Sequence, residues 1–161
     1  MFIKSLSALI AAALATPAFA ASEPATRPSA ALTQAGAEAT LQASERLARQ
    51  ANDPAAIAVV DTDGLLMAFV RMEGVRPGSV ELAIGKARTA ALMQRPTAEL
   101  EANVAQGRVG LATAGLTALG GGAPLKIGGE TVGAIGVAGL KKENDLTNSA
   151  AVAAAFPASA H

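Results

Sequence analysis

Residues 55–72 read AAIAVVDTDGLLMAFVRM, and the expected architecture is built outward from this segment. The run Ala55–Val60 is apolar without alternation and ends in β-branched residues, which predicts a strand buried on both faces. A second strand-like run, Leu65–Met72, follows the turn sequence DTDG at Asp61–Gly64, and an Asp-Gly step between two such runs indicates a hairpin. DTDG could also form a calcium loop, but it lacks the third acidic position and the distal Glu of an EF-hand, so we interpret it as a turn.

A second hairpin is expected nearer the C-terminus, where strands at Pro124–Ile127 and Glu130–Ala138 flank the tight turn Gly128-Gly129. We expect one further strand, at Leu116–Leu119. Four helices are predicted by apolar periodicity and end signals: Leu32–Ala51 capped by Thr33, Val80–Met93 capped by Ser79, a shorter helix from Thr97 to near Gly107, and Asn144–Ala155. Hairpins outnumber crossovers in this order of elements, which predicts an α+β domain with a largely antiparallel, five-stranded sheet flanked by helices.

Composition excludes several classes of chemistry. The 161 residues include no Cys, Trp or Tyr and a single His, which is His161. Disulfides, iron–sulfur clusters and a multi-histidine zinc site are therefore excluded. The 13 basic and 13 acidic residues balance, and few aromatic residues are available to stack on bases, so nucleic acid is not an expected partner. The spacing Gly133-x-x-Gly136-x-x-Gly139 lies in a predicted strand and is not the fingerprint of an NAD site.

The N-terminus has the pattern of an export signal. Residues 1–20 contain Lys4, an apolar stretch at Leu6–Leu14, and a small-residue ending Ala18-Phe19-Ala20. An amphipathic N-terminal helix is the alternative. We expect cleavage near Ala20, a periplasmic or secreted mature protein, a flexible tether at residues 21–31, one domain at 32–156 and a short tail at 157–161. No later segment is long and apolar enough for a membrane anchor.

The mature chain is rich in Ala and Gly, so its core is expected to consist of small side chains. Small side chains bury less apolar area and therefore contribute less transfer free energy, at about 25 cal/mol per Å². Burial of further surface against copies of the same chain would compensate, and we expect a homo-oligomer.

Two groups of residues could bind a ligand. Arg71, Glu73, Lys86 and Thr89 could form a polar pocket for a carboxylate, with Arg71 as a planar clamp; the alternative is that each is a solvated surface group. The run Gly120-Gly121-Gly122-Ala123-Pro124 could let a ligand approach the backbone closely, or could serve only turns and tight packing.

Several strings together resemble the GlcG/HbpS-like family of haem-degrading or extracellular haem-binding proteins. They are AIAVVDTDGLLMAFVRMEG, SVELAIGKARTAALMQRPT, GGGAPLKIGGETVGAIGVAG and the later END, and the resemblance covers about residues 32–155. It implies a profilin-like fold around a five-stranded antiparallel sheet, assembly into oligomers, and haem as a ligand; other members belong to glycolate or diol utilisation operons. The ligand-binding positions implied by matching motifs are Arg71, Glu73, Lys86, Thr89, Gly122, Pro124 and Asp145.

Two features depart from that family pattern. Ala138 stands where many relatives have serine, and no histidine lies inside the domain. Haem iron is usually held by His, Cys, Met or Tyr, which leaves only methionines and the terminal histidine as metal candidates, with Met72 and His161 as weak ones.

Three hypotheses follow for the function. The first is an exported haem-binding and potentially haem-degrading protein. The second is a binder of, or an enzyme for, a small hydroxy- or oxo-carboxylate such as glycolate. The third is a self-assembling sensory or structural partner without a ligand.

Overall fold

Two antiparallel hairpins form the sheet of this domain in the computed structural model, which describes residues 29–156. Strands β1 (Ala56–Asp61) and β2 (Leu66–Arg71) make the first hairpin, and β3 (Gly122–Ile127) and β4 (Glu130–Ala138) make the second. The expected signal peptide at 1–20, most of the tether at 21–31, the tail at 157–161 and His161 lie outside the described residues. No helix within residues 29–156 is long and apolar enough to cross a membrane.

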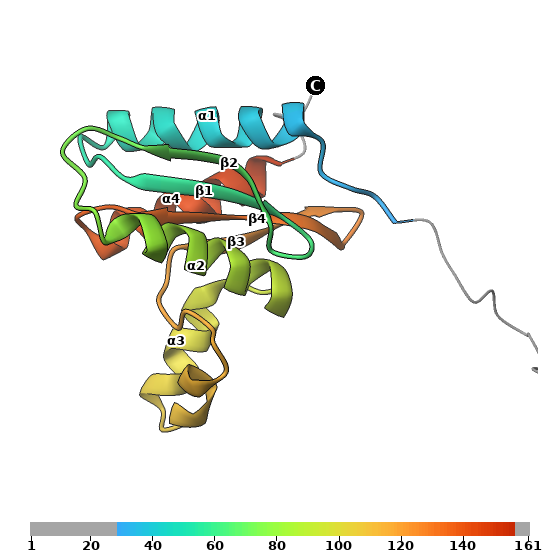
Figure 1. Ribbon diagram of the computed structural model, residues 1–161, viewed down its shortest axis with the longest axis vertical. Coiled ribbons are helices and arrows are strands. Elements are labelled where there is room, and N and C mark those ends of the chain that lie inside the picture. Colours follow the sequence, from blue (N-terminus) through green and yellow to red (C-terminus); the bar gives the residue numbers. More distant parts are fainter. Residues whose placement is uncertain (1–28, 157–161) are drawn as a thin grey trace, which may run out of the picture.

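Helices cover both faces of the sheet, whose strand order is β2-β1-β4-β3 (Figure 1). Helices α1 (Gln34–Gln50) and α4 (Lys142–Ala155) pack on one face and contact each other, while α2 (Ser79–Met93) lies across β1, β3 and β4 on the other. Helix α3 (Thr97–Ala105) and the short 3₁₀ helix η1 (Val109–Thr113) extend away from the sheet at the end of α2 (Figure 1). The predicted α+β class and antiparallel pairing are confirmed.

The central strands are buried on both faces, as their sequences predict. Residues Ala56–Val60 of β1 are fully buried, and β4 is buried from Val132 to Ala138. The Asp61–Gly64 segment is a turn, in which Asp61 Oδ1 accepts hydrogen bonds from the backbone N–H groups of Asp63 and Leu65 at 2.9 and 2.8 Å. Gly128 and Gly129, with φ of 58° and 86°, form the turn of the second hairpin.

Small residues allow α2 to lie directly on β4. The helix face Ala83, Ala87, Ala90 and Ala91 is buried. Opposite it, a Cβ added at Gly136 would lie 2.1 Å from the carbonyl oxygen of Ala83 and 2.5 Å from the backbone nitrogen of Ala87. The structure thus gives Gly136 a packing role.

Two predictions of local structure are wrong. The sheet has four strands instead of five, because Leu116–Leu119 is not a strand. This segment is held against α2 by side chains: Thr117 donates its N–H to Thr89 Oγ1 at 2.8 Å, and its own hydroxyl occupies the space beside Gly85. Ser79 is also not a helix cap, since α2 starts at this residue, Gly78 is its N-cap, and no side chain caps the helix. Thr33 does cap α1, accepting from the Gly36 N–H at 3.1 Å.

Candidate functional site

A buried ion pair connects the two faces of the domain. Lys86 of α2 and Asp145 of α4 are 4% and 6% exposed, and Lys86 Nζ lies 2.9 Å from Asp145 Oδ2. The ammonium also donates to the carbonyl oxygen of Val137 at 2.8 Å, and Asp145 Oδ1 accepts from the Gly139 N–H at 2.6 Å. Burial raises the pKa of Asp145 above its ordinary value, against the opposing hydrogen bond and charge of Lys86. The pair therefore joins α2, α4 and the end of β4 through charged side chains that are buried from solvent.

Glycines make room for this pair. A Cβ at Gly121, whose φ is 111°, would lie 2.7 Å from the carbonyl oxygen of Val137 and 3.0 Å from Lys86 Nζ. A Cβ at Gly122 would lie 2.4 Å from the carbonyl oxygen of Lys86. The N–H of Gly122 donates to Thr97 Oγ1 at 2.9 Å, and Pro124 is buried two residues further along β3. The structure thus brings Lys86, Asp145 and Gly122 together.

A second, more exposed ion pair lies next to the buried one. Glu101 of α3 pairs with Lys142 of α4 at 2.7 Å and accepts from the Gly120 N–H at 3.1 Å. Lys86, Asp145, Glu101 and Lys142 all border a small cavity of 210 Å³. Burial raises the pKa of Glu101, but the hydrogen bonds from Lys142 and Gly120 and the charges of Lys142 and Lys86 outweigh it, so the pKa is lowered overall.

Glu101→Gln is expected to reduce the free energy of unfolding at neutral pH by about 1 kcal/mol. Because the folded-state pKa of Glu101 is lowered, the stabilisation by its carboxylate is present above the ordinary glutamate pKa and is lost as the pH falls through the folded-state pKa. Urea unfolding at pH 7 and pH 3.5 measures the difference between wild type and variant. A difference that stays constant or grows on acidification would contradict this assignment.

The other predicted positions lie apart from the ion pair. Thr89 is 2% exposed, and its hydroxyl accepts from Thr117. Arg71 is exposed at the end of β2, and Glu73 is exposed in the turn that follows. Lys86 borders the 210 Å³ cavity, whereas Thr89 and Glu73 border two other cavities. The residues expected to form one carboxylate-binding pocket therefore do not line a common cavity.

Three larger cavities surround the domain. The α2–α3 cavity, of 330 Å³, is bordered by Thr89 and by a group that includes Leu92, Met93, Arg95, Leu100, Arg108 and Leu111. The α1–α4 cavity, of 310 Å³, lies on the other face of the sheet, and its lining includes Leu47, Ala51, Asp53, Asp145, Asn148 and Ala151. A third, of 410 Å³, is open and polar and includes Met72 and Glu73. Sequence reasoning missed Arg95, Arg108 and Asp53.

The methionines differ in how available their sulfur atoms are. Met72 is 8% exposed, and its sulfur accepts the N–H of Ala55 at 3.4 Å, which makes it part of the core. Met93, at the end of α2, is 38% exposed and borders the α2–α3 cavity. Within residues 29–156, Met93 is therefore better placed than Met72 to reach a bound group.

The four-stranded antiparallel sheet, with α1 and α4 on one face and α2 on the other, defines an α+β domain. The sequence model of the family described as "Haem degrading protein HbpS-like" matches residues 32–155. The chain belongs to this HbpS-like family, as its sequence motifs predict.

Similarity to individual relatives agrees with this assignment. Protein GlcG of Escherichia coli (strain K12) is 40% identical over 107 residues, which are 66% of this chain and 80% of that protein. The crystal structure of HbpS superposes with a TM-score of 0.75 at 32% identity, covering 82% of this chain and 94% of HbpS. A PduOC–haem complex has a TM-score of 0.71 at 28% identity, covering 80% of this chain and 96% of PduOC.

Proposed function

We propose that this protein binds haem and that the α2–α3 cavity is the binding site. The observation that carries the proposal is the combination of apolar walls, two arginines and an accessible methionine around one cavity. The family match and the haem complex of the relative PduOC support haem as the ligand class.

The walls of the α2–α3 cavity suit a porphyrin. Leu92, Leu100 and Leu111 come from α2, α3 and η1, so apolar side chains of three elements border the same space. Leu92 is 52% exposed, so its apolar side chain is accessible to a ligand in this cavity. Ligand cavities typically have volumes from about 300 Å³, so 330 Å³ accepts part of a porphyrin and leaves an edge outside. A second copy of the chain could cover that edge, which agrees with the expected homo-oligomer.

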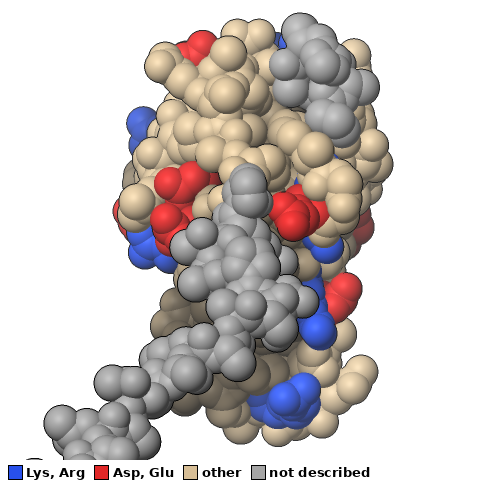
Figure 2. Space-filling model, turned by 90° about the vertical axis from the view of Figure 1, so that its right-hand side faces the viewer, with Lys and Arg blue, Asp and Glu red and all other residues tan. Residues whose placement is uncertain are grey.

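Arg95 and Arg108 supply the charge that haem propionates require. None of the ion pairs found within residues 29–156 involves either guanidinium, so both are available to an incoming carboxylate. Glu99 also borders the cavity, which leaves a net positive charge. Figure 2 shows basic side chains at the lower end of the molecule, which α3 and η1 form. Guanidinium groups bind carboxylates through two parallel hydrogen bonds, which gives orientation as well as affinity.

Met93 is the residue in this cavity that can ligate iron through sulfur. When bound, haem would supply redox chemistry at its iron, and the protein would contribute the thioether, the apolar shield and the two arginines. No histidine lies within residues 29–156, so we propose weaker binding than in a histidine-ligated site. His161 of the same or a neighbouring chain stays a candidate outside the described residues.

Export is part of the same proposal, and the sequence of residues 1–20 supports it. An exported protein with an open, weakly ligating site suits the capture of free haem better than permanent storage. The proposal is limited to binding.

The double variant Arg95→Gln/Arg108→Gln is expected to weaken haem binding at least tenfold, because a hydrogen bond to a charged group contributes about 1.5–3 kcal/mol. Soret titration of the purified mature protein measures this. The double variant Arg46→Gln/Arg76→Gln is the matched control, since it also removes two positive charges, from exposed positions that do not line the cavity. Equal affinity in wild type and Arg95→Gln/Arg108→Gln would overturn the choice of cavity.

A small carboxylate such as glycolate is the second candidate, because Thr89, Arg95 and Arg108 border one cavity and would suit its carboxyl and hydroxyl groups. Only a ligand that binds the native state raises the melting temperature. A glycolate-dependent rise that is lost in the arginine variant, together with a flat Soret response, would favour this candidate over haem.

A further inference from the structure

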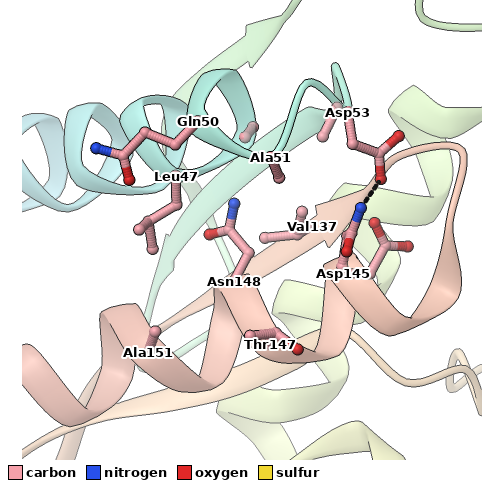
Figure 3. A pocket seen from close by; sticks show the side chains of 12 residues that line it. Leu47, Gln50, Ala51, Asp53, Val137, Asp145, Thr147, Asn148 and Ala151 are labelled. Carbon is pink, nitrogen blue, oxygen red and sulfur yellow. Dashed lines mark hydrogen bonds between the residues drawn. The ribbon is translucent and has the colours of Figure 1, made fainter.

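The α1–α4 cavity lies on the opposite face of the sheet from the proposed haem site and has a different chemistry. Figure 3 shows its two ends: Leu47 and Ala151 lie at one, and Asp53 and Asp145 lie at the other. The cavity lies between two helices, and Val137 of β4 forms its floor. Its ligand should therefore be amphipathic, with an apolar body and one polar end.

Asp53 is the unusual residue of this cavity. The residue is 3% exposed, and its side chain accepts a hydrogen bond from the neutral amide of Asn144, whose Nδ2 lies 2.8 Å from Asp53 Oδ2. None of the ion pairs within residues 29–156 involves Asp53. Asn144 belongs to the first turn of α4, where the helix dipole favours a negatively charged neighbour. A carboxylate has about four acceptor sites, so Asp53 retains capacity for a further donor.

Two other polar residues of the cavity lining, Asp145 and Asn148, are already paired. Asp145 is neutralised by Lys86, which approaches from the α2 side of the sheet. Asn148 accepts from the Ser44 hydroxyl at 2.7 Å and donates to the Ser44 carbonyl oxygen at 2.9 Å. Of the described residues that line the cavity, none is Lys or Arg. The cavity therefore carries one uncompensated negative charge at its polar end.

We propose that the α1–α4 cavity binds a small organic cation, namely a primary ammonium group attached to a short apolar chain. The ammonium would donate to the carboxylate of Asp53, and the chain would lie along Leu47, Ala51 and Ala151. Asp53 forms no ion pair in the described part of the chain, and a bound ammonium would supply a charge-assisted hydrogen bond to its carboxylate. Carboxylates, including haem propionates, are disfavoured because they would meet Asp53 with like charge.

A metal ion fits this cavity less well than an ammonium. Within residues 29–156, no group of three or more acidic or histidine side chains is arranged to hold a metal. The apolar end of the cavity would also contribute nothing to a bare ion. An alkylammonium would contact both ends of the cavity, with its charged group at Asp53 and its alkyl chain at the apolar end.

The test compares three ligands of one length: n-pentylamine, 1-pentanol and pentanoate. They are added at pH 7, in calorimetric titrations and thermal-shift assays, to the mature protein carrying Arg95→Gln/Arg108→Gln, which removes the carboxylate-binding arginines of the α2–α3 cavity. Pentylamine is expected to bind and raise the melting temperature, pentanol to bind at least tenfold more weakly, and pentanoate to show no shift. Equal binding of amine and alcohol would overturn the role of charge, and binding of pentanoate would overturn the proposal.

Variants locate the site and keep it separate from the haem proposal. Asp53→Asn should abolish the preference for amine over alcohol, whereas Asp63→Asn, in the exposed β1–β2 turn, should leave it unchanged. If Asp53→Asn fails to fold, Ala151→Met fills the apolar end, keeps the carboxylate and should weaken amine binding at least tenfold. Neither cavity variant should change the Soret titration. Unchanged amine binding in the folded variants would overturn the site.

Discussion

Gly136→Ala is expected to lower the free energy of unfolding by about 3 kcal/mol, the upper end of the usual cost of overpacking, and the melting temperature by about 10 °C. The added methyl group would lie 2.1 Å from the carbonyl oxygen of Ala83 and 2.5 Å from the backbone nitrogen of Ala87. Both are backbone atoms of α2, so the strain cannot be relieved by rotation of a side chain. The whole helix must move away from β4.

Gly78→Ala is the control for this prediction. Gly78 is the exposed N-cap of α2, its φ is −63°, and nothing lies within 4 Å of an added Cβ. Differential scanning calorimetry of both variants should show a large decrease in melting temperature for Gly136→Ala and little change for Gly78→Ala. Similar melting temperatures for the two variants would mean that the backbone of α2 does not lie in close contact with Gly136 of β4.

Lys86→Met is expected to destabilise the fold by about 3–5 kcal/mol at pH 7, since it leaves the buried carboxylate of Asp145 without its cation. The companion double variant Lys86→Met/Asp145→Leu removes both charges and should be more stable than Lys86→Met alone. Denaturant unfolding of the single and double variants measures this difference. The loss of unfolding free energy in the double variant could instead equal the summed losses of Lys86→Met and Asp145→Leu. That result would contradict a direct interaction between the two side chains.

The pH dependence of Lys86→Met has a defined sign. Burial already raises the pKa of Asp145, and loss of Lys86 removes the influence that opposes this rise. A carboxyl group with a raised folded-state pKa binds its proton more tightly in the native state, so stability falls as the pH rises from about 4 upward. The deficit of Lys86→Met relative to wild type should therefore shrink as the pH is lowered toward 4.

The sheet could be predicted from sequence because its signals are local. The turn residues Asp61–Gly64 and Gly128-Gly129 lie between apolar runs, and each pair of strands needs only that short connection. Leu116–Leu119 has the composition of a strand, but its backbone is held by Thr89 of α2. That tertiary contact, which no local pattern contains, leaves the sheet with four strands.

The candidate sites were only partly predictable for the same reason. Lys86 and Thr89 are three residues apart on one helix, yet the first turns to Asp145 and the second to Thr117. In the sequence, Asp53 only follows the helix that is predicted to end at Ala51, and the packing of α4 over it shows that its carboxylate is buried. Arg95 precedes α3 and Arg108 follows it, and only the packing of α3 against α2 and η1 brings both arginines to one cavity.

The most direct test of the haem proposal is a Soret titration of the mature wild-type protein with ferric haem, checked by magnetic circular dichroism for a thioether ligand. We predict saturable binding, a shifted Soret band, and loss of the thioether signature in Met93→Leu with the fold intact. A flat response at micromolar haem would contradict haem binding, and an unchanged ligand signature in Met93→Leu would contradict the placement of haem beside α2 and α3.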